Sequence, residues 1–186
     1  MSAQPSLIAL ANLLTFSRLV LLPLVIVGVT TNCGPLAVVA MVAIWVTDLL
    51  DGRLARRGGQ ASPSGKALDS TVDFVLIYSL FITFYAAGRL ATYQFAILYL
   101  SMLGILTLQL LEGMGGETAT TLLGKITGAL QYAYLLFLVA LEVVPEGRVL
   151  SLVNLVVFAA LAVAIVLNTG ECAVRVAARL RGADAR

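Results

Sequence analysis

The sequence predicts an all-α integral membrane protein with six transmembrane helices, an interfacial segment before them and a basic helical tail after them. Of the 186 residues, 60% are hydrophobic and 12% are charged, and the mean hydropathy of +1.00 is far above that of a soluble domain. Apolar runs long enough to cross about 30 Å of hydrocarbon recur along nearly the whole chain. No polar stretch is long enough for a separate soluble domain, so we expect residues 1–186 to form a single membrane domain.

Glycine, proline and charged residues separate the apolar runs and set the order of the elements. A short segment at about 4–15 is expected to lie along the membrane interface. Because this segment lacks a basic region followed by a cleavage site, we expect the first helix to remain in the mature protein. A basic tail over 170–186 follows the last span. The six spans are expected near 16–30, 35–56, 64–87, 91–111, 123–143 and 150–168.

Positive charge is concentrated on one side of this topology. Six crossings place both termini on the same side, and only two of the twelve Lys and Arg residues, Arg89 and Arg148, fall on the opposite side. This excess predicts a multi-pass protein of the cell (inner or plasma) membrane with both termini in the cytoplasm. The basic rim suits anionic lipid headgroups and phosphorylated substrates, and it requires no nucleic acid partner. The other ten basic residues are Arg18, Arg53, Arg56, Arg57, Lys66, Lys125, Arg175, Arg179, Arg181 and Arg186.

The residue types present exclude several kinds of chemistry. The chain has no histidine, which excludes His-based acid–base catalysts, Ser/His hydrolases and His-ligated zinc or haem. Cys33 and Cys172 are far apart in the sequence and form neither a CxxC pair nor a four-ligand metal set. We interpret both cysteines as apolar packing residues, so carboxylates must carry any chemistry.

Four aspartates lie at the predicted cytoplasmic ends of two consecutive spans, in the stretch TDLLDGRLARRGGQASPSGKALDSTVDF. Asp48 and Asp51 are spaced i,i+3, and Asp69 and Asp73 are spaced i,i+4, so each pair lies on one face of its helix. A charge near the hydrocarbon costs several kcal/mol, so these side chains are expected to face a polar cavity or a cation.

The turn between the two spans, RGGQASPSG, predicts an antiparallel hairpin. Gly58 and Gly59 give it flexibility, and Ser62 followed by Pro63 is typical of an N-cap with proline at the first helical position. Folded in this way, the four carboxylates oppose one another and repel unless cations neutralise them. Such all-oxygen ligation favours Mg²⁺, Mn²⁺ or Ca²⁺.

Small residues and one arginine accompany the acids. Gly52, Ala55 and Gly65 remove side-chain bulk, which lets a nucleotide approach the helix backbone, and Arg56 offers donors to phosphate. The set as a whole indicates a surface that binds a metal-bound diphosphate. Taken singly, each of these residues also has a structural interpretation without any ligand, because Asp/Arg pairs occur at solvated helix ends and small residues serve helix packing.

This stretch resembles the signature of the CDP-alcohol phosphotransferase family, D-x2-D-G-x2-A-R-x8-G-x3-D-x3-D. All spacers agree, and the family's six-helix membrane fold, with an amphipathic segment before the first span, agrees with the predicted topology. Asn12, Thr15 and Arg18 in NLLTFSRL are similar to an N-x2-T-x2-R pattern at the first helix of many members, which makes Asn12 and Thr15 candidate binding residues, although an ordinary polar stripe has the same spacing. The eight matching signature positions are Asp48, Asp51, Gly52, Ala55, Arg56, Gly65, Asp69 and Asp73.

The resemblance implies a reaction and a role for each matching residue. A phosphatidyl group would pass from CDP-diacylglycerol to the hydroxyl of a small polar alcohol, with release of CMP. Asp48, Asp51 and Asp69 would coordinate divalent metal, Mg²⁺ or Mn²⁺ and two ions in all. Asp73 would contact the second ion and act as the general base. The family also implies a homodimer. The CDP moiety would be held by Gly52, Ala55, Arg56 and Gly65.

The acceptor is less closely defined. GKITGALQ (124–131) is similar to a segment of phosphatidylglycerophosphate synthases, which favours glycerol 3-phosphate. Those synthases usually carry a lysine after the base, whereas this chain has Phe74, so inositol phosphate, serine or another alcohol stay open. A phosphorylated acceptor needs cations, and Lys66, Lys125 and Arg175 are candidates, but each also suits a snorkelling anchor.

Other protein classes use buried acids as well. A transporter could use them as an ion site or proton relay, but it requires no Gly, Ala and Arg at fixed offsets, and we find no inverted repeat. Aspartate-rich prenyltransferases normally carry two separated acidic motifs, whereas all four acids here lie within 26 residues. An inactive scaffold is disfavoured because the acids are intact.

Overall fold

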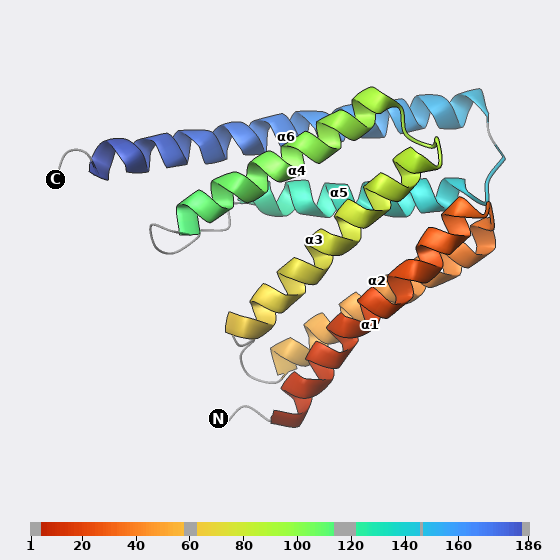
Figure 1. Ribbon diagram of the computed structural model, residues 1–186, viewed down its shortest axis with the longest axis horizontal. Helices are drawn as coiled ribbons and strands as arrows, with labels where there is room; N and C mark the ends of the chain where they lie inside the picture. The colour runs from red at the N-terminus through yellow and green to blue at the C-terminus, as the bar shows by residue number, and fades with distance from the viewer. Residues whose placement is uncertain (1–4, 58–62, 114–121, 146, 184–186) are drawn as a thin grey trace. The chain divides into compact units, whose positions relative to one another are not determined.

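The computed structural model describes residues 5–57, 63–113, 122–145 and 147–183, and these residues form six helices and no strands (Figure 1). This confirms the all-α prediction. The helices are α1 (Pro5–Thr30), α2 (Gly34–Arg57), α3 (Pro63–Ala86), α4 (Thr92–Gly113), α5 (Leu122–Leu141) and α6 (Arg148–Ala183).

Five of the helices contain a window that is long and apolar enough to cross a membrane; they are α1, α2, α3, α5 and α6. Over its described residues α4 does not give such a window. Large apolar side chains point outward along these helices; Val20 is 74% exposed and Val166 is 67% exposed. Outward apolar side chains are expected where lipid, not water, surrounds the helices. The chain is therefore a multi-pass membrane protein.

Two helices are longer than the spans predicted for them. Helix α1 runs without a break through both the predicted interfacial segment and the first span, and its apolar window begins at Leu13. Helix α6 likewise covers the sixth span and most of the basic tail. In both places the sequence offers no strong helix breaker at the predicted boundary, because a lone Gly170 weakens a helix by only about 1 kcal/mol. Pro23 lies inside α1, as membrane helices tolerate.

Two helices of the first half end in the same left-handed cap. After α1, Asn32 has a φ of 55°, and the Cys33 N–H donates to the carbonyl of Gly28 at 2.8 Å. After α3, Gly88 has a φ of 73°, and the Arg89 N–H closes the equivalent bond at 2.8 Å. These bonds satisfy carbonyls at the helix ends, which allows very short turns.

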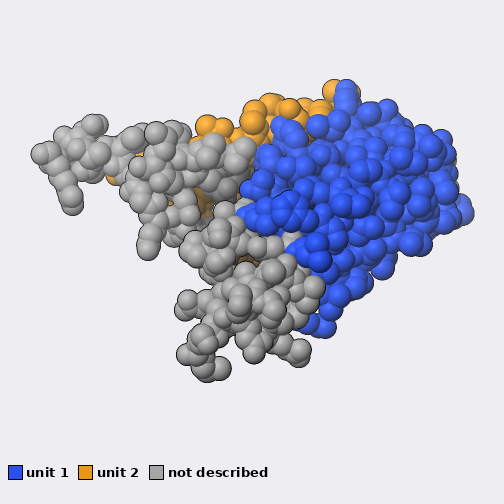
Figure 2. Space-filling model, turned by 60° about the horizontal axis from the view of Figure 1, so that its bottom comes forward, with its two compact units in different colours: residues 1–89, 135–145 blue, residues 90–134, 146–186 orange. Residues whose placement is uncertain are grey.

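The chain divides into two compact units (Figure 2). Unit 1 consists of residues 1–89 and 135–145, and in it α1 packs against both α2 and α3. Unit 2 consists of residues 90–134 and 146–186, and in it α4 packs against α6. The core of unit 1 includes Val25, Ile44, Leu76, Leu80 and Phe84, and that of unit 2 includes Leu98, Tyr134, Leu161 and Ile165.

The packing of unit 1 determines where the acids meet. The first half of α1, the last turns of α2 and the first turns of α3 lie at the same end of the unit (Figure 1). The predicted hairpin arms therefore bring their acidic ends together, and both arms pack on α1.

Candidate active site

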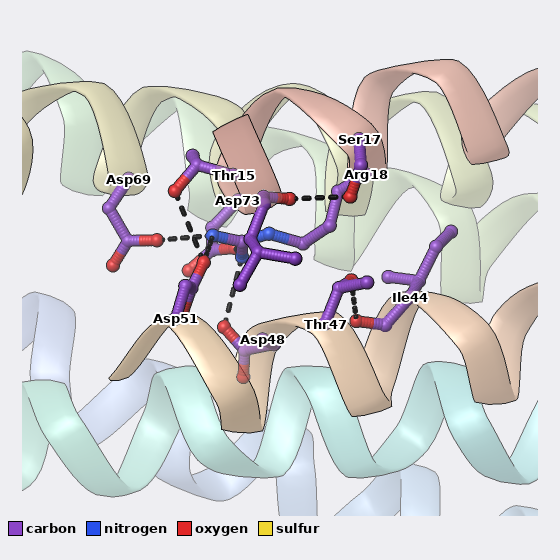
Figure 3. Close-up of polar contacts among 10 residues, drawn as sticks. Thr15, Ser17, Arg18, Ile44, Thr47, Asp48, Asp51, Asp69 and Asp73 are labelled. Carbon is purple, nitrogen blue, oxygen red and sulfur yellow. Dashed lines mark hydrogen bonds and ion pairs between the residues drawn. The ribbon is translucent and has the colours of Figure 1, made fainter. Parts of the chain in front are cut away.

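One arginine occupies the centre of the acidic cluster (Figure 3). The Arg18 Nη1 group donates to Asp48 Oδ1 at 3.0 Å and to Asp73 Oδ1, and Nη2 donates to Asp51 Oδ2 at 2.8 Å and to Asp69 Oδ1. A guanidinium has four terminal N–H groups. Each of the four therefore serves a different carboxylate.

Three helices supply these side chains through their ordinary periodicity. Each acidic pair shares one face of its helix, as the i,i+3 and i,i+4 spacings predict. Both pairs turn their carboxylates toward Arg18 of α1. On α1, Thr15 and Arg18 are also i,i+3, and the Thr15 hydroxyl donates to Asp51 Oδ2 at 3.1 Å. The acids of α2 and α3 do not face each other across an empty gap, because the arginine of α1 lies between them.

The cluster is closed on one side and open on the other. The side chain of Arg18 is fully buried, and that of Asp51 is only 8% exposed. The side chains of Asp48, Asp69 and Asp73 are 36%, 48% and 37% exposed, so a ligand can reach them. The fifth donor of the guanidinium, Arg18 Nε–H, is buried and has no hydrogen-bond partner among the described residues.

The acids fit a hard divalent cation. One oxygen from each of Asp48, Asp51 and Asp69 can be chosen so that all three lie within 4.8 Å of one another. A shared divalent cation would draw these oxygens closer together, because Mg²⁺ takes its oxygen ligands at about 2.0–2.1 Å. Four ionised carboxylates carry four negative charges and Arg18 supplies one positive charge, which leaves a net attraction for further cations.

The remaining predicted site residues are only partly described. Gly52 is half-buried on α2, directly after Asp51. The surroundings of four others lie outside the described part of the structure, although their backbones belong to α1, α2 and α3; they are Asn12, Ala55, Arg56 and Gly65.

Two of the three basic residues proposed for the acceptor, Lys125 and Arg175, belong to unit 2, and the side chain of the third, Lys66, lies outside the described part of the structure. Lys125 is exposed on α5. Arg175 is half-buried on α6, where its Nη2 donates to Cys172 Sγ at 3.1 Å. Because the acids belong to unit 1, a role for these residues at the acidic cluster stays a prediction.

Arg18 is the site residue whose position the sequence did not predict. The sequence placed it in an N-x2-T-x2-R pattern similar to that of the family, or in an ordinary polar stripe, and on the basic side of the topology, but it did not place Arg18 among the acids. A stronger signal was present, because Arg18 is a charge inside an apolar run, and such a charge calls for a buried partner.

Comparison with known proteins identifies the family of the chain. The sequence model of the family named CDP-alcohol phosphatidyltransferase matches residues 8–170. Two proteins of Mycobacterium tuberculosis, from strains CDC 1551 / Oshkosh and ATCC 25618 / H37Rv, are each 30% identical to this chain over 168 residues, which is 87% of this chain and 78% of theirs. Each is named a probable phosphatidylglycerophosphate synthase. The chain therefore belongs to the CDP-alcohol phosphatidyltransferase family, whose members transfer substituted phosphate groups from a CDP-alcohol to an alcohol acceptor.

Proposed function

We propose that this enzyme transfers the phosphatidyl group of CDP-diacylglycerol to the hydroxyl of a small polar alcohol and releases CMP. The observation that carries the proposal is the meeting of four carboxylates from α2 and α3 at one partly open polar site. Their oxygens suit a divalent cation, Mg²⁺ or Mn²⁺, and the signature supports two such ions. Asp48, Asp51, Asp69 and Asp73 would hold them.

The donor would lie beside the acids on the same two helices. Gly52 directly follows Asp51, so a nucleotide can approach the backbone of α2 there. The other signature positions, Ala55, Arg56 and Gly65, complete the proposed CDP site. Arg56 would donate to phosphate oxygens through its planar guanidinium.

Asp73 would take the proton of the acceptor hydroxyl as the hydroxyl oxygen attacks the lipid-side phosphorus. Its side chain is 37% exposed, so an acceptor can reach it. One oxygen accepts from Arg18, and the carboxylate has a second oxygen for the hydroxyl. Bound divalent metal would neutralise the diphosphate and the departing CMP.

Glycerol 3-phosphate is the acceptor we favour. The segment 124–131 and the names of the two mycobacterial relatives both support it. The absence of a lysine after Asp73 keeps inositol phosphate and serine as alternatives. Lys125 and Arg175 are proposed to contact an acceptor phosphate.

The distribution of positive charge supports a location and an orientation in the membrane. We propose that the chain acts as one membrane domain in the cell membrane, with both termini and the site at the cytoplasmic face. We also propose a homodimer, as the family resemblance implies.

A panel of reactions tests the function. Purified protein in lipid nanodiscs is given CDP-diacylglycerol, Mg²⁺ or Mn²⁺, and one acceptor at a time: glycerol 3-phosphate, inositol phosphate, inositol or serine. Among these acceptors, we expect only glycerol 3-phosphate to give CMP release. Removal of the metal with EDTA should abolish this release. Turnover with serine but not glycerol 3-phosphate contradicts the acceptor and leaves the reaction class intact.

Matched variants test the site. Asp73→Asn removes the base at nearly constant volume, and we expect a rate loss of at least about 100-fold. Asp184→Asn makes the same chemical change outside the signature, and its rate should stay at the wild-type level. Equal rates for Asp73→Asn and wild type would exclude the proposed base.

A further inference from the structure

The four carboxylates already have a cation of their own. Arg18 donates one terminal N–H to each of Asp48, Asp51, Asp69 and Asp73, and its side chain is completely buried. It comes from α1, whereas the acids come from α2 and α3. One guanidinium therefore connects three helices at the point where divalent metal would bind.

The same contacts place a positive charge against the candidate metal ligands. Asp48, Asp51 and Asp69 are the three acids whose oxygens come within 4.8 Å of one another, and Arg18 binds an oxygen of each. A divalent ion held there would be repelled by the guanidinium and would share its acceptors. The arginine neutralises only one of four negative charges, so it reduces the attraction for metal without abolishing it.

We propose that Arg18 is an internal counter-cation that keeps the carboxylates of α2 and α3 assembled before metal binds, and that divalent metal competes with it for them. This inference rests on the proposed metal site. Arg18 is in this sense a positioning residue that sets metal affinity. It stabilises the metal-free protein and weakens metal binding, two effects of opposite sign.

The opposite signs separate this role from a purely structural one. An arginine that only braced the helices would, when replaced, lower both stability and metal affinity. A competing cation, when replaced by a neutral side chain, lowers the stability of the metal-free protein but raises metal affinity. Arg18→Gln is the suitable variant because it removes the charge and keeps a donor amide.

The experiment measures Mn²⁺ binding to EDTA-treated protein in nanodiscs by the electron paramagnetic resonance signal of free Mn²⁺. For Arg18→Gln we expect the Mn²⁺ Kd to fall about tenfold. The midpoint of thermal unfolding of the metal-free variant, followed by fluorescence of the single tryptophan, Trp45, should fall, and Mn²⁺ should raise it by more than in wild type. Arg53→Gln is the control, because Arg53 is an exposed arginine of α2; its Mn²⁺ Kd should change less than about twofold.

Unchanged or weaker Mn²⁺ binding by folded Arg18→Gln overturns the inference, as does wild-type protein that binds no Mn²⁺. If Arg18→Gln folds only when Mn²⁺ is present, that result supports the competition directly. If Arg18→Gln folds neither with nor without Mn²⁺, the Arg18→Lys variant tests the inference instead. Lysine keeps the positive charge but has only three donors for the four carboxylates, so it should compete less well with metal. The Mn²⁺ Kd of Arg18→Lys should fall about threefold, and an unchanged or higher Kd overturns the inference.

CMP release by wild-type protein from the same preparation separates the two proposals. If wild-type enzyme is active but the Arg18 variants bind Mn²⁺ with unaltered affinity, the proposed function is supported and the inference about Arg18 is wrong. If the variants bind Mn²⁺ more tightly but wild-type protein turns over no acceptor, the inference is supported and the proposed function is wrong.

Discussion

Thr15 is a small polar residue whose contribution to stability depends on the charged side chain of Asp51 beside it. It is buried, and its hydroxyl donates to Asp51, the most deeply buried acid of the cluster. Thr15→Val keeps the shape but removes this donor. We expect a loss of about 1.5–3 kcal/mol in the free energy of unfolding, because a hydrogen bond to a charged, buried acceptor is lost. Unfolding in detergent, followed by Trp45 fluorescence, measures it.

The matched control for this change is Thr15→Ser, which keeps the hydroxyl and removes only a methyl group. It should retain more stability than Thr15→Val. The reverse order would show that packing of the methyl group, not the bond to Asp51, makes this position important.

At the scale of residues, the sequence predicted the acids and missed their central partner. The i,i+3 and i,i+4 spacings are local, so they identify which carboxylates share a helix face. The position of Arg18 depends on how α1 packs against α2 and α3, which is a non-local fact that no spacing contains. The charge in an apolar run indicated that a partner was needed but not which residue it was.

At the scale of helices, the contact between α1 and α2 depends on one glycine. A Cβ placed on Gly28 would lie 2.6 Å from the backbone nitrogen of Ala37 and 2.9 Å from its Cα. Backbone atoms cannot turn away as a flexible side chain can, so the two helices must separate. We expect Gly28→Ala to cost about 1–3 kcal/mol in the free energy of unfolding.

Gly104 provides the control for that substitution. It also lies inside a helix, but a Cβ added there meets nothing within 4 Å. Gly104→Ala should therefore be neutral or stabilising by up to about 1 kcal/mol, because alanine favours the helix. Equal losses for both variants in the same unfolding assay would contradict a steric origin.

A second set of polar contacts joins the turns at the other end of unit 1. Arg89, after α3, pairs with Glu142 after α5 at 3.0 Å and donates to Asn32 after α1 at 2.7 Å. The Glu142 side chain is only 5% exposed, so losing Arg89 would leave a buried charge unpaired. We expect Arg89→Met to cost about 1–3 kcal/mol.

The double variant tests whether the unpaired charge is the cause. Arg89→Met combined with Glu142→Gln removes both charges, and it should be more stable than Arg89→Met alone. Simple addition of two losses in thermal unfolding would instead show that each residue acts through separate contacts.

At the scale of the molecule, hydropathy predicted the class and the six helices, because apolar runs and their breaks are read directly from sequence. It predicted the ends of α1 and α6 less well. A change from lipid interface to hydrocarbon alters the surroundings of a helix without interrupting its hydrogen bonds, so α1 and α6 continue across predicted boundaries. The division into two units depends on packing between distant segments, and composition contains no sign of it.

The proposed orientation in the membrane can be tested with a cysteine that the chain already has. Cys33 is exposed in the turn between α1 and α2, whereas Cys172 is buried. With cytoplasmic termini, one crossing places Cys33 on the outer side. A membrane-impermeant maleimide should therefore label it in intact cells, and Cys33→Ser should abolish the signal. Ala185→Cys in the Cys33→Ser background should be labelled only after permeabilisation.

The same labelling locates the active site relative to the membrane. Cys33 directly precedes α2, and Asp48 follows it by 15 residues, which is about 22 Å of helix rise. A cysteine at the outer surface therefore places the carboxylates near the cytoplasmic face, where the basic residues would meet a phosphorylated acceptor. The opposite result would show that the topology is inverted: Ala185→Cys would be labelled in intact cells, and Cys33 of the wild-type chain would be labelled only after permeabilisation. Because Cys33 and the acids of α2 lie toward opposite ends of that helix, an inverted topology would place the active site at the outer face.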